Sequence, residues 1–236
     1  MKSLIDLHTH TIVSGHAFST LHENIQAASE KGLKFLGTSE HGPTMPNGAH
    51  EWYFSNLRVV PRNIKGVEIL RGAEANIINS QGELDLTIIE MDALDYMIAS
   101  LHPPCFPYDT IENNTMAILN AMKNPKVKVI GHPDESCYPL DYEKLVEGAK
   151  KYDVLLEVNN SSLDPDGFRI GAIDNLTIML KECMKKNVKI ILGSDAHIHY
   201  DIGNFLRCEA LLEKLGFPDE LVVNYSEKEI RKYFYE

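Results

Sequence analysis

Short apolar stretches alternate with longer amphipathic ones along the whole chain. The short stretches are rich in Val, Ile, Leu and aromatic residues, which is typical of strands, and the longer ones repeat apolar residues every three or four positions, which is typical of helices. We predict seven strands, at Leu4–Thr9, Phe35–Thr38, Glu68–Ala73, Tyr96–Ser100, Val127–Gly131, Val154–Val158 and Val188–Gly193. We predict helices at Leu21–Lys31, Ile111–Met122, Tyr142–Lys151, Ile173–Lys186 and Phe205–Leu215.

The strands are apolar almost throughout and are bounded by helices, which indicates a parallel sheet covered on both faces. The strand and helix unit repeats at roughly 30 residues, the size of a βα element. Seven such units fit one α/β barrel domain over residues 1–236 better than two domains, and no linker-like segment divides the chain. An open doubly wound sheet is the structural alternative, and it would carry ligands mainly at one switch point.

Side chains of the metal-ligand type follow six of the seven predicted strands. They occur in the stretches DLHTHT, SEHG, GAEAN, SLHPP, GHPDE and SDAH. The nine candidates are His8, His10, His16, His41, Glu74, His102, His132, Asp195 and His197. Because only a barrel gathers six strand ends around one cavity, this distribution favours a closed or nearly closed barrel over the open sheet.

Imidazole and carboxylate groups suit borderline divalent metals such as zinc. Residues two apart on a strand point the same way, so His8 and His10 face the cavity if Ile5 and Leu7 face the helices. Asp6, on the same strand, has two possible roles. Its carboxylate either hydrogen-bonds a ligand imidazole or accepts from backbone N–H groups.

Nine ligands are too many for one ion, since zinc usually takes three or four protein ligands. They suffice for two ions, or for three if a carboxylate bridges. Glu74 and Asp195 are the only acids of the set, and we select Glu74 as the bridge because it has the longer reach. His22 and His50 are expected to be exposed or locally bonded.

Composition and net charge limit the kinds of partner that this chain can bind. The chain is 44% hydrophobic and 24% charged, with enough apolar material for a sizeable core. Its 23 basic and 34 acidic residues give a net charge of −11, which argues against a general nucleic-acid-binding surface. No apolar run reaches the ~18 residues of a membrane span, and no secretory pattern precedes the first strand. The four cysteines are widely spaced, so we expect a reducing cytoplasm.

Together these motifs resemble the PHP (polymerase and histidinol phosphatase) family of metal-dependent phosphoesterases, and most closely its small single-domain phosphatases. The resemblance runs from DLHTHT to GSDAH and implies a distorted seven-stranded (β/α)7 TIM-like barrel. It also implies three divalent ions, which are zinc, manganese or iron in this family. By this resemblance His8 and His10 bind one ion with Glu74 and Asp195. Glu74 bridges to a second ion, bound by His102 and His132, and a third is held by His16, His41 and His197.

A polymetal centre of this kind activates water and clamps phosphate oxygens. We expect in-line attack of a metal-bound hydroxide on the phosphate monoester of a small phosphorylated metabolite. The leaving alkoxide would be stabilised by a metal, or protonated by His199 or by a water on Asp195. Arg169 and Arg62 are candidates for a substrate anion, and Asn159 for positioning the substrate.

Three other functions remain open from the sequence. An amidohydrolase-type C–N hydrolase shares the H-x-H pair and the late Asp, but commonly bridges its metals with a carboxylated lysine, and no predicted strand ends in lysine. A phosphodiesterase or exonuclease acting on short oligonucleotides is the second, disfavoured by the acidic balance. A non-catalytic metal-binding protein is the third.

Overall fold

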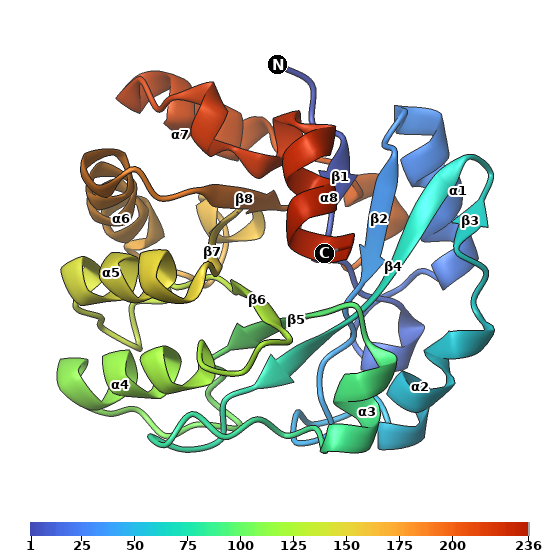
Figure 1. Cartoon of the computed structure of the whole chain (residues 1–236), viewed down its shortest axis with the longest axis horizontal. Coiled ribbons are helices and arrows are strands. Elements are labelled where there is room, and N and C mark those ends of the chain that lie inside the picture. Colours follow the sequence, from blue (N-terminus) through green and yellow to red (C-terminus); the bar gives the residue numbers. More distant parts are fainter. Residues whose placement is uncertain (236) are drawn as a thin grey trace.

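The computed structural model describes residues 1–235. Seven parallel strands form a nearly closed barrel surrounded by helices, which confirms the predicted fold class (Figure 1). In barrel order they are β1 (Ile5–Asp6), β2 (Phe35–Thr38), β4 (Val67–Asn76), β5 (Tyr96–Ser100), β6 (Val127–Ile130), β7 (Leu155–Asn159) and β8 (Ile190–Gly193). A short strand, β3 (Asn63–Ile64), pairs antiparallel with β4.

Side chains and loops rather than a regular ladder close the barrel between β1 and β8. Beyond the two strands, the His10 N–H donates to the Ala196 carbonyl at 2.9 Å. Nearer their amino ends, the buried Asn224 amide donates to the carbonyls of Ile5 and Leu192, and its oxygen accepts from the Leu192 N–H. Asn224 therefore satisfies backbone groups that a neighbouring strand would otherwise satisfy.

The helices are α1 (Leu21–Lys31), α2 (Glu51–Asn56), α3 (Ile88–Ala93), α4 (Ile111–Ala121), α5 (Tyr142–Tyr152), α6 (Ala172–Lys186), α7 (Leu206–Leu215) and α8 (Glu227–Tyr235). Side-chain caps explain several of their starts: Thr20 and Thr87 form capping boxes with Glu23 and Glu90. The five predicted helices are present with small shifts at their ends. The sequence pattern did not identify α2, α3 or α8.

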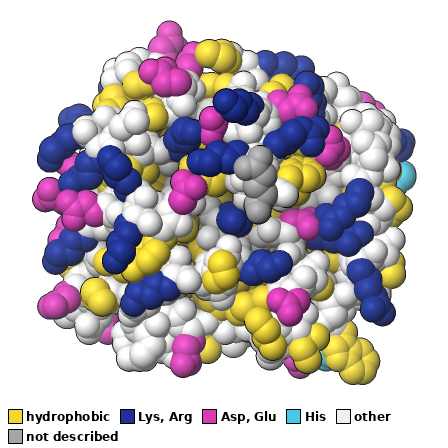
Figure 2. Space-filling view, in the orientation of Figure 1, with side chains coloured by type: hydrophobic (Ala, Val, Ile, Leu, Met, Phe, Trp, Pro, Cys, Tyr) yellow, Lys and Arg dark blue, Asp and Glu magenta, His cyan; other side chains and the backbone are white. Residues whose placement is uncertain are grey.

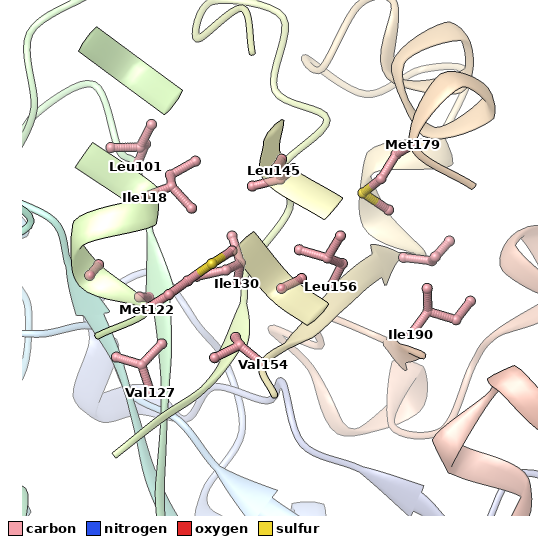
Figure 3. Close-up of a cluster of buried hydrophobic side chains, with 14 of the residues drawn as sticks. Leu101, Ile118, Met122, Val127, Ile130, Leu145, Val154, Leu156, Met179 and Ile190 are labelled. Atoms are coloured by element: carbon pink, nitrogen blue, oxygen red, sulfur yellow. The ribbon is translucent and has the colours of Figure 1, made fainter. Parts of the chain in front are cut away.

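Apolar side chains pack in two layers, one on each side of the barrel wall. The outer layer lies between the strands and α4, α5 and α6, where Ile118, Leu145 and Met179 meet the outward-facing residues Ile130 and Leu156 (Figure 3). This is the burial expected for helices that cover a parallel sheet.

The inner layer consists of inward-facing strand residues and the buried face of α8. Ile5 and Leu7 belong to it, together with Ile98, Leu155 and Ile230. In Figure 1, α8 crosses the front of the barrel. We had expected His8 and His10 to face the cavity on condition that Ile5 and Leu7 face the helices. That condition is wrong, because Ile5 and Leu7 face the barrel interior. Regular strand geometry ends at Asp6, and the irregular backbone beyond it turns both imidazoles to the cavity.

Tyr96 fills the middle of the barrel. Its hydroxyl donates to the Leu7 carbonyl at 2.6 Å across the interior. A Cβ at Gly72 would lie 2.2 Å from the Tyr96 ring, so this position on β4 requires glycine. The ring belongs to the inner apolar layer and packs edge-on against Phe234 of α8, with the ring centroids 5.8 Å apart.

The face that carries α8 is studded with Lys and Arg, and histidine shows only at its margins (Figure 2). Several of these cations are paired, as Arg231 is with Glu68 and Lys34 with Glu227. The histidines gather elsewhere. Within residues 1–235, no helix combines the length and apolar character needed to cross a bilayer.

Candidate metal centre

A cavity of about 340 Å³ opens where the barrel strands end. Every one of the seven barrel strands contributes a residue to its wall, either from its own end or from the loop that follows. The lining residues are His16, His41, Met45, Glu74, Leu101, His102, Pro103, His132, Glu135, Ser161, Phe168, Arg169, Asp195 and His197. His8 and His10 lie beneath them, fully buried.

Glu74 occupies the centre of the cluster. It lies inside β4, which extends to Asn76, and its side chain is completely buried. One carboxylate oxygen, Oε1, lies 3.2 Å from His102 Nε2 and 2.9 Å from His132 Nε2. The other, Oε2, lies 2.7 Å from His41 Nδ1, and 3.3 and 3.5 Å from the Nε2 atoms of His8 and His10. The two oxygens therefore face two different groups of imidazoles.

Asp195 joins the same cluster from the loop after β8. Its Oδ1 lies 3.6 Å from His8 Nε2 and 3.3 Å from His10 Nε2. The residue has a φ of 55°, in the left-handed region that is strained for a non-glycine residue. This backbone turns the carboxylate back over the strand ends.

The remaining candidate ligands form a stack of rings. His10 lies 4.3 Å from His41 and 4.5 Å from His197, measured between ring centroids. His16 lies 5.0 Å from His41 and 4.7 Å from His197 and is the most exposed ring of the group. All nine residues predicted as ligands are thus brought to one place.

The donor set fits bound cations. Four buried atoms that point into the cluster make no hydrogen bond within residues 1–235: His8 Nε2, His10 Nε2, His41 Nδ1 and Glu74 Oε2. Ligand atoms of three overlapping trios lie within 4.8 Å of one another: His10, His41 and His197; His8, His10 and Glu74; His41, Glu74 and His102. Because buried polar atoms are normally paired, this convergence indicates groups that a metal would satisfy.

The pKa shifts give an ionised Glu74 and neutral His10 and His102, whereas the carboxylates around His8 and His41 raise the pKa of both imidazoles against the effect of burial. Burial alone would raise the pKa of the Glu74 carboxyl, but the imidazoles of His8, His102 and His41 hold that pKa well below its usual range. Burial also lowers the pKa of His10 well below its ordinary value, and that of His102 to about 4. An ionised carboxylate and neutral imidazoles are the forms that bind metals.

Groups outside the ligand set orient it. Glu157, on β7, accepts from His8 Nδ1 and from the His132 N–H, both at 2.7 Å. His102 Nδ1 lies 2.7 Å from Asn76 Oδ1. When one ring nitrogen of a histidine donates to a carboxylate or amide oxygen, the other ring nitrogen keeps its lone pair free for a metal.

Glu157 is the residue that sequence reasoning missed. It follows two leucines in the stretch LLEVNN, so a charged side chain in an apolar strand was available as a signal. Its buried position also explains Gly193, where a Cβ would lie 1.9 Å from Glu157 Oε1. For Asp6, the structure selects the backbone reading: the carboxylate accepts from the N–H groups of Ser194 and Gly203.

Two of the predicted substrate-contacting residues lie in the site. Arg169 is buried among acids, with Nη1 3.2 Å from Asp195 Oδ2 and Nε 3.0 Å from Glu135. Asn159 Nδ2 lies 3.2 Å from the same Asp195 oxygen.

The other two candidates lie elsewhere. Arg62 precedes β3 and pairs with Asp95, which precedes β5, so it stands at the opposite end of the barrel from the cavity. His199 Nδ1 contacts the Ser19 hydroxyl at 2.9 Å, and the ring does not line the cavity. His22 is exposed, and His50 is an exposed helix cap.

A barrel with convergent imidazoles and carboxylates at its carboxyl end is that of a metal-binding α/β protein. The PHP domain family matches residues 6–170 of the chain. The chain belongs to the PHP family, as its motifs indicated.

Relatives of known sequence cover the chain from end to end. It is 52% identical over 233 residues to a probable phosphatase of Clostridium acetobutylicum, covering 99% of this chain and 95% of the relative. It is 46% identical over 237 residues to a probable phosphatase of Thermoanaerobacter sp. strain X514, covering 100% and 96%. Among solved structures, the histidinol phosphate phosphatase of Lactococcus lactis, complexed with zinc, L-histidinol and phosphate, matches with a TM-score of 0.61. That match covers 92% of this chain and 95% of the other at 15% identity, which supports the fold alone.

Proposed function

We propose that this chain is a metal-dependent phosphatase that hydrolyses phosphate monoesters at a centre of three divalent ions. The observation that carries the proposal is the convergence of unpartnered, buried ligand atoms on Glu74. The similarity to relatives named probable phosphatases supports the activity, and the similarly folded phosphatase of Lactococcus lactis was solved with zinc and phosphate.

The separation of the imidazoles by the two oxygens of Glu74 supports the partition of the ligands among the ions. His102 and His132 face Oε1, whereas His8 and His10 face Oε2 together with Asp195. The third ion is assigned to the outer rings of His16, His41 and His197. Zinc is our first choice for the metal, with manganese or iron as alternatives.

When bound, the metals would supply an activated water and positive charge for the phosphate oxygens. The chain itself supplies the remaining parts. Arg169, held beside Asp195, binds a phosphate oxygen through its guanidinium, and Asn159 fixes the Asp195 carboxylate. Asp195 orients the water through Oδ1, because Oδ2 is already engaged by Arg169. Because His199 does not line the cavity, we assign protonation of the leaving alkoxide to a water on Asp195.

The cavity disfavours the competing functions. A volume of about 340 Å³ suits a small phosphorylated metabolite, and an extended oligonucleotide would need a longer track of positive charge. Among the described lining residues there is no lysine to form a carboxylated bridge, and Glu74 takes that central place.

The test combines elemental analysis with hydrolysis of two aryl esters. We expect about three metals per chain and chelator-sensitive turnover of p-nitrophenyl phosphate, with much slower turnover of bis(p-nitrophenyl) phosphate. Fewer than two metals per chain after reconstitution would overturn the proposed centre. A preference for the diester would overturn the proposed substrate class in favour of a phosphodiesterase.

A further inference from the structure

The site cavity is lined by apolar residues as well as by candidate metal ligands. Four of its lining residues are apolar: Met45, Leu101, Pro103 and Phe168. Phe168 stands out among them, because 77% of its surface is exposed although it lines a cavity. An aromatic ring left this exposed at a cavity wall offers apolar surface that a ligand would cover.

Charge in the cavity is concentrated at one end. Arg169 is the only Lys or Arg among the described lining residues, and it is held by Asp195 and Glu135. One guanidinium and the metal centre together suit one phosphate group. A second anionic group on the substrate would find no further Lys or Arg on the described part of the wall.

Phe168 and Arg169 are neighbours in the loop after β7, with the guanidinium carbon 5.1 Å from the centroid of the ring. A phosphate bound to the guanidinium therefore places its ester oxygen and first carbon close to the ring. Met45 and Pro103 line the same cavity and offer further apolar surface to the alcohol part of the substrate.

Resting on the phosphatase function proposed above, we propose that Phe168, with Met45 and Pro103, forms an apolar subsite for the alcohol part of the substrate. The subsite selects phosphate monoesters of short, uncharged, apolar alcohols, and best those that carry a single ring. The cavity volume of about 340 Å³ limits the whole ligand to this size.

The test compares kcat/KM for benzyl phosphate and glycerol 2-phosphate. Both esters release an alkoxide, so the comparison depends mainly on the alcohol and little on leaving-group chemistry. We expect wild-type protein to prefer benzyl phosphate. Phe168→Ala should lower the ratio of kcat/KM for benzyl phosphate to kcat/KM for glycerol 2-phosphate about tenfold, or ~1.4 kcal/mol, whereas loss of the ring beside Arg169 affects both esters alike. Because the ring is largely exposed, the variant is expected to fold normally.

Ile170→Ala is the matched control, because Ile170 belongs to the same loop, is 82% exposed and does not line the cavity. It should leave both esters unaffected. A second experiment measures the affinity of two phosphonates by calorimetry, so that no turnover is involved. Benzylphosphonate is expected to bind more tightly than methylphosphonate. Equal losses for both esters in Phe168→Ala, or equal phosphonate affinities in wild type, overturn the subsite. Absence of turnover on both esters by metal-loaded protein overturns the phosphatase function instead.

Discussion

Glu157→Gln is the most informative single substitution, because it changes one atom in the buried support of the metal ligands. The carboxylate accepts two short hydrogen bonds, from His8 Nδ1 and from the His132 N–H. The backbone N–H of His132 cannot change its role, and its φ of 26° makes that strand end depend on a partner. The glutamine oxygen is therefore required at His132.

The glutamine NH2 group then faces His8 Nδ1. Either His8 changes tautomer and carries a proton on Nε2, toward Glu74, or two donors oppose each other in a buried site. The first outcome blocks the lone pair that would bind metal, and the second loses a charge-assisted hydrogen bond, which is worth about 1.5–3 kcal/mol. Substitution of such supporting partners typically lowers metal affinity roughly 10–100-fold.

The assay is zinc affinity in a chelator-buffered titration, with the thermal midpoint of the apoprotein measured in parallel. Asp6→Asn is the control, since Asp6 is an equally buried carboxylate that accepts only from backbone N–H groups. We expect both variants to lower the midpoint, and only Glu157→Gln to weaken zinc binding. Unchanged zinc affinity in Glu157→Gln, or an equal loss in Asp6→Asn, would refute the reasoning.

Three further predictions concern the metal centre. Glu74→Ala should lose more than one metal equivalent by elemental analysis and His41→Ala chiefly one, and equal losses would contradict Glu74 as the bridge. Arg169→Lys should raise the KM for a phosphate monoester about tenfold with full metal content, because lysine cannot form a bidentate contact. Lost metal would instead make Arg169 a support for Asp195. Removal of metal by a chelator should lower the calorimetric midpoint by roughly 5–10 °C for each ion removed, as expected for a site whose ligand is present at about 100 times its Kd, and an unchanged midpoint would exclude stabilising sites.

The fold was largely predictable because its main signal is repetitive. Buried parallel strands are apolar throughout, and α4, α5 and α6 present regular apolar stripes, so each element carries its own evidence. The helices α2 and α3 are only six residues long, too short for a periodic pattern to emerge. The nine-residue helix α8 did carry a local signal that we did not use, because its buried residues Ile230, Tyr233 and Phe234 have the i, i+3, i+4 spacing of an apolar helix face.

The ligand set was also visible in the sequence, because an imidazole at the end of an apolar strand loses hydration on burial and needs a binding partner in return. The backbone geometry around these ligands could not be predicted from the sequence. We expected regular alternation from Ile5 to His10, but the strand ends at Asp6, and the left-handed backbone at Asp195 is likewise hidden from strand periodicity. Arg62 and Arg169 were indistinguishable as loop arginines, and only the tertiary structure separates one from the other.

The candidate metal ligands form a polar layer beside the inner apolar layer of the barrel, and this position determines what their burial costs. The inner apolar layer, which includes Tyr96, lies next to this polar layer, and Glu74 and His8 are almost completely buried. Without a cation these side chains oppose folding, because buried carboxylates and imidazoles lose hydration and gain few hydrogen bonds. The packing of the two apolar layers and the Asn224 closure offset part of this cost. Side chains fixed by packing and by Glu157 would hold the proposed ions with little rearrangement, and the ions would supply charge for a phosphate.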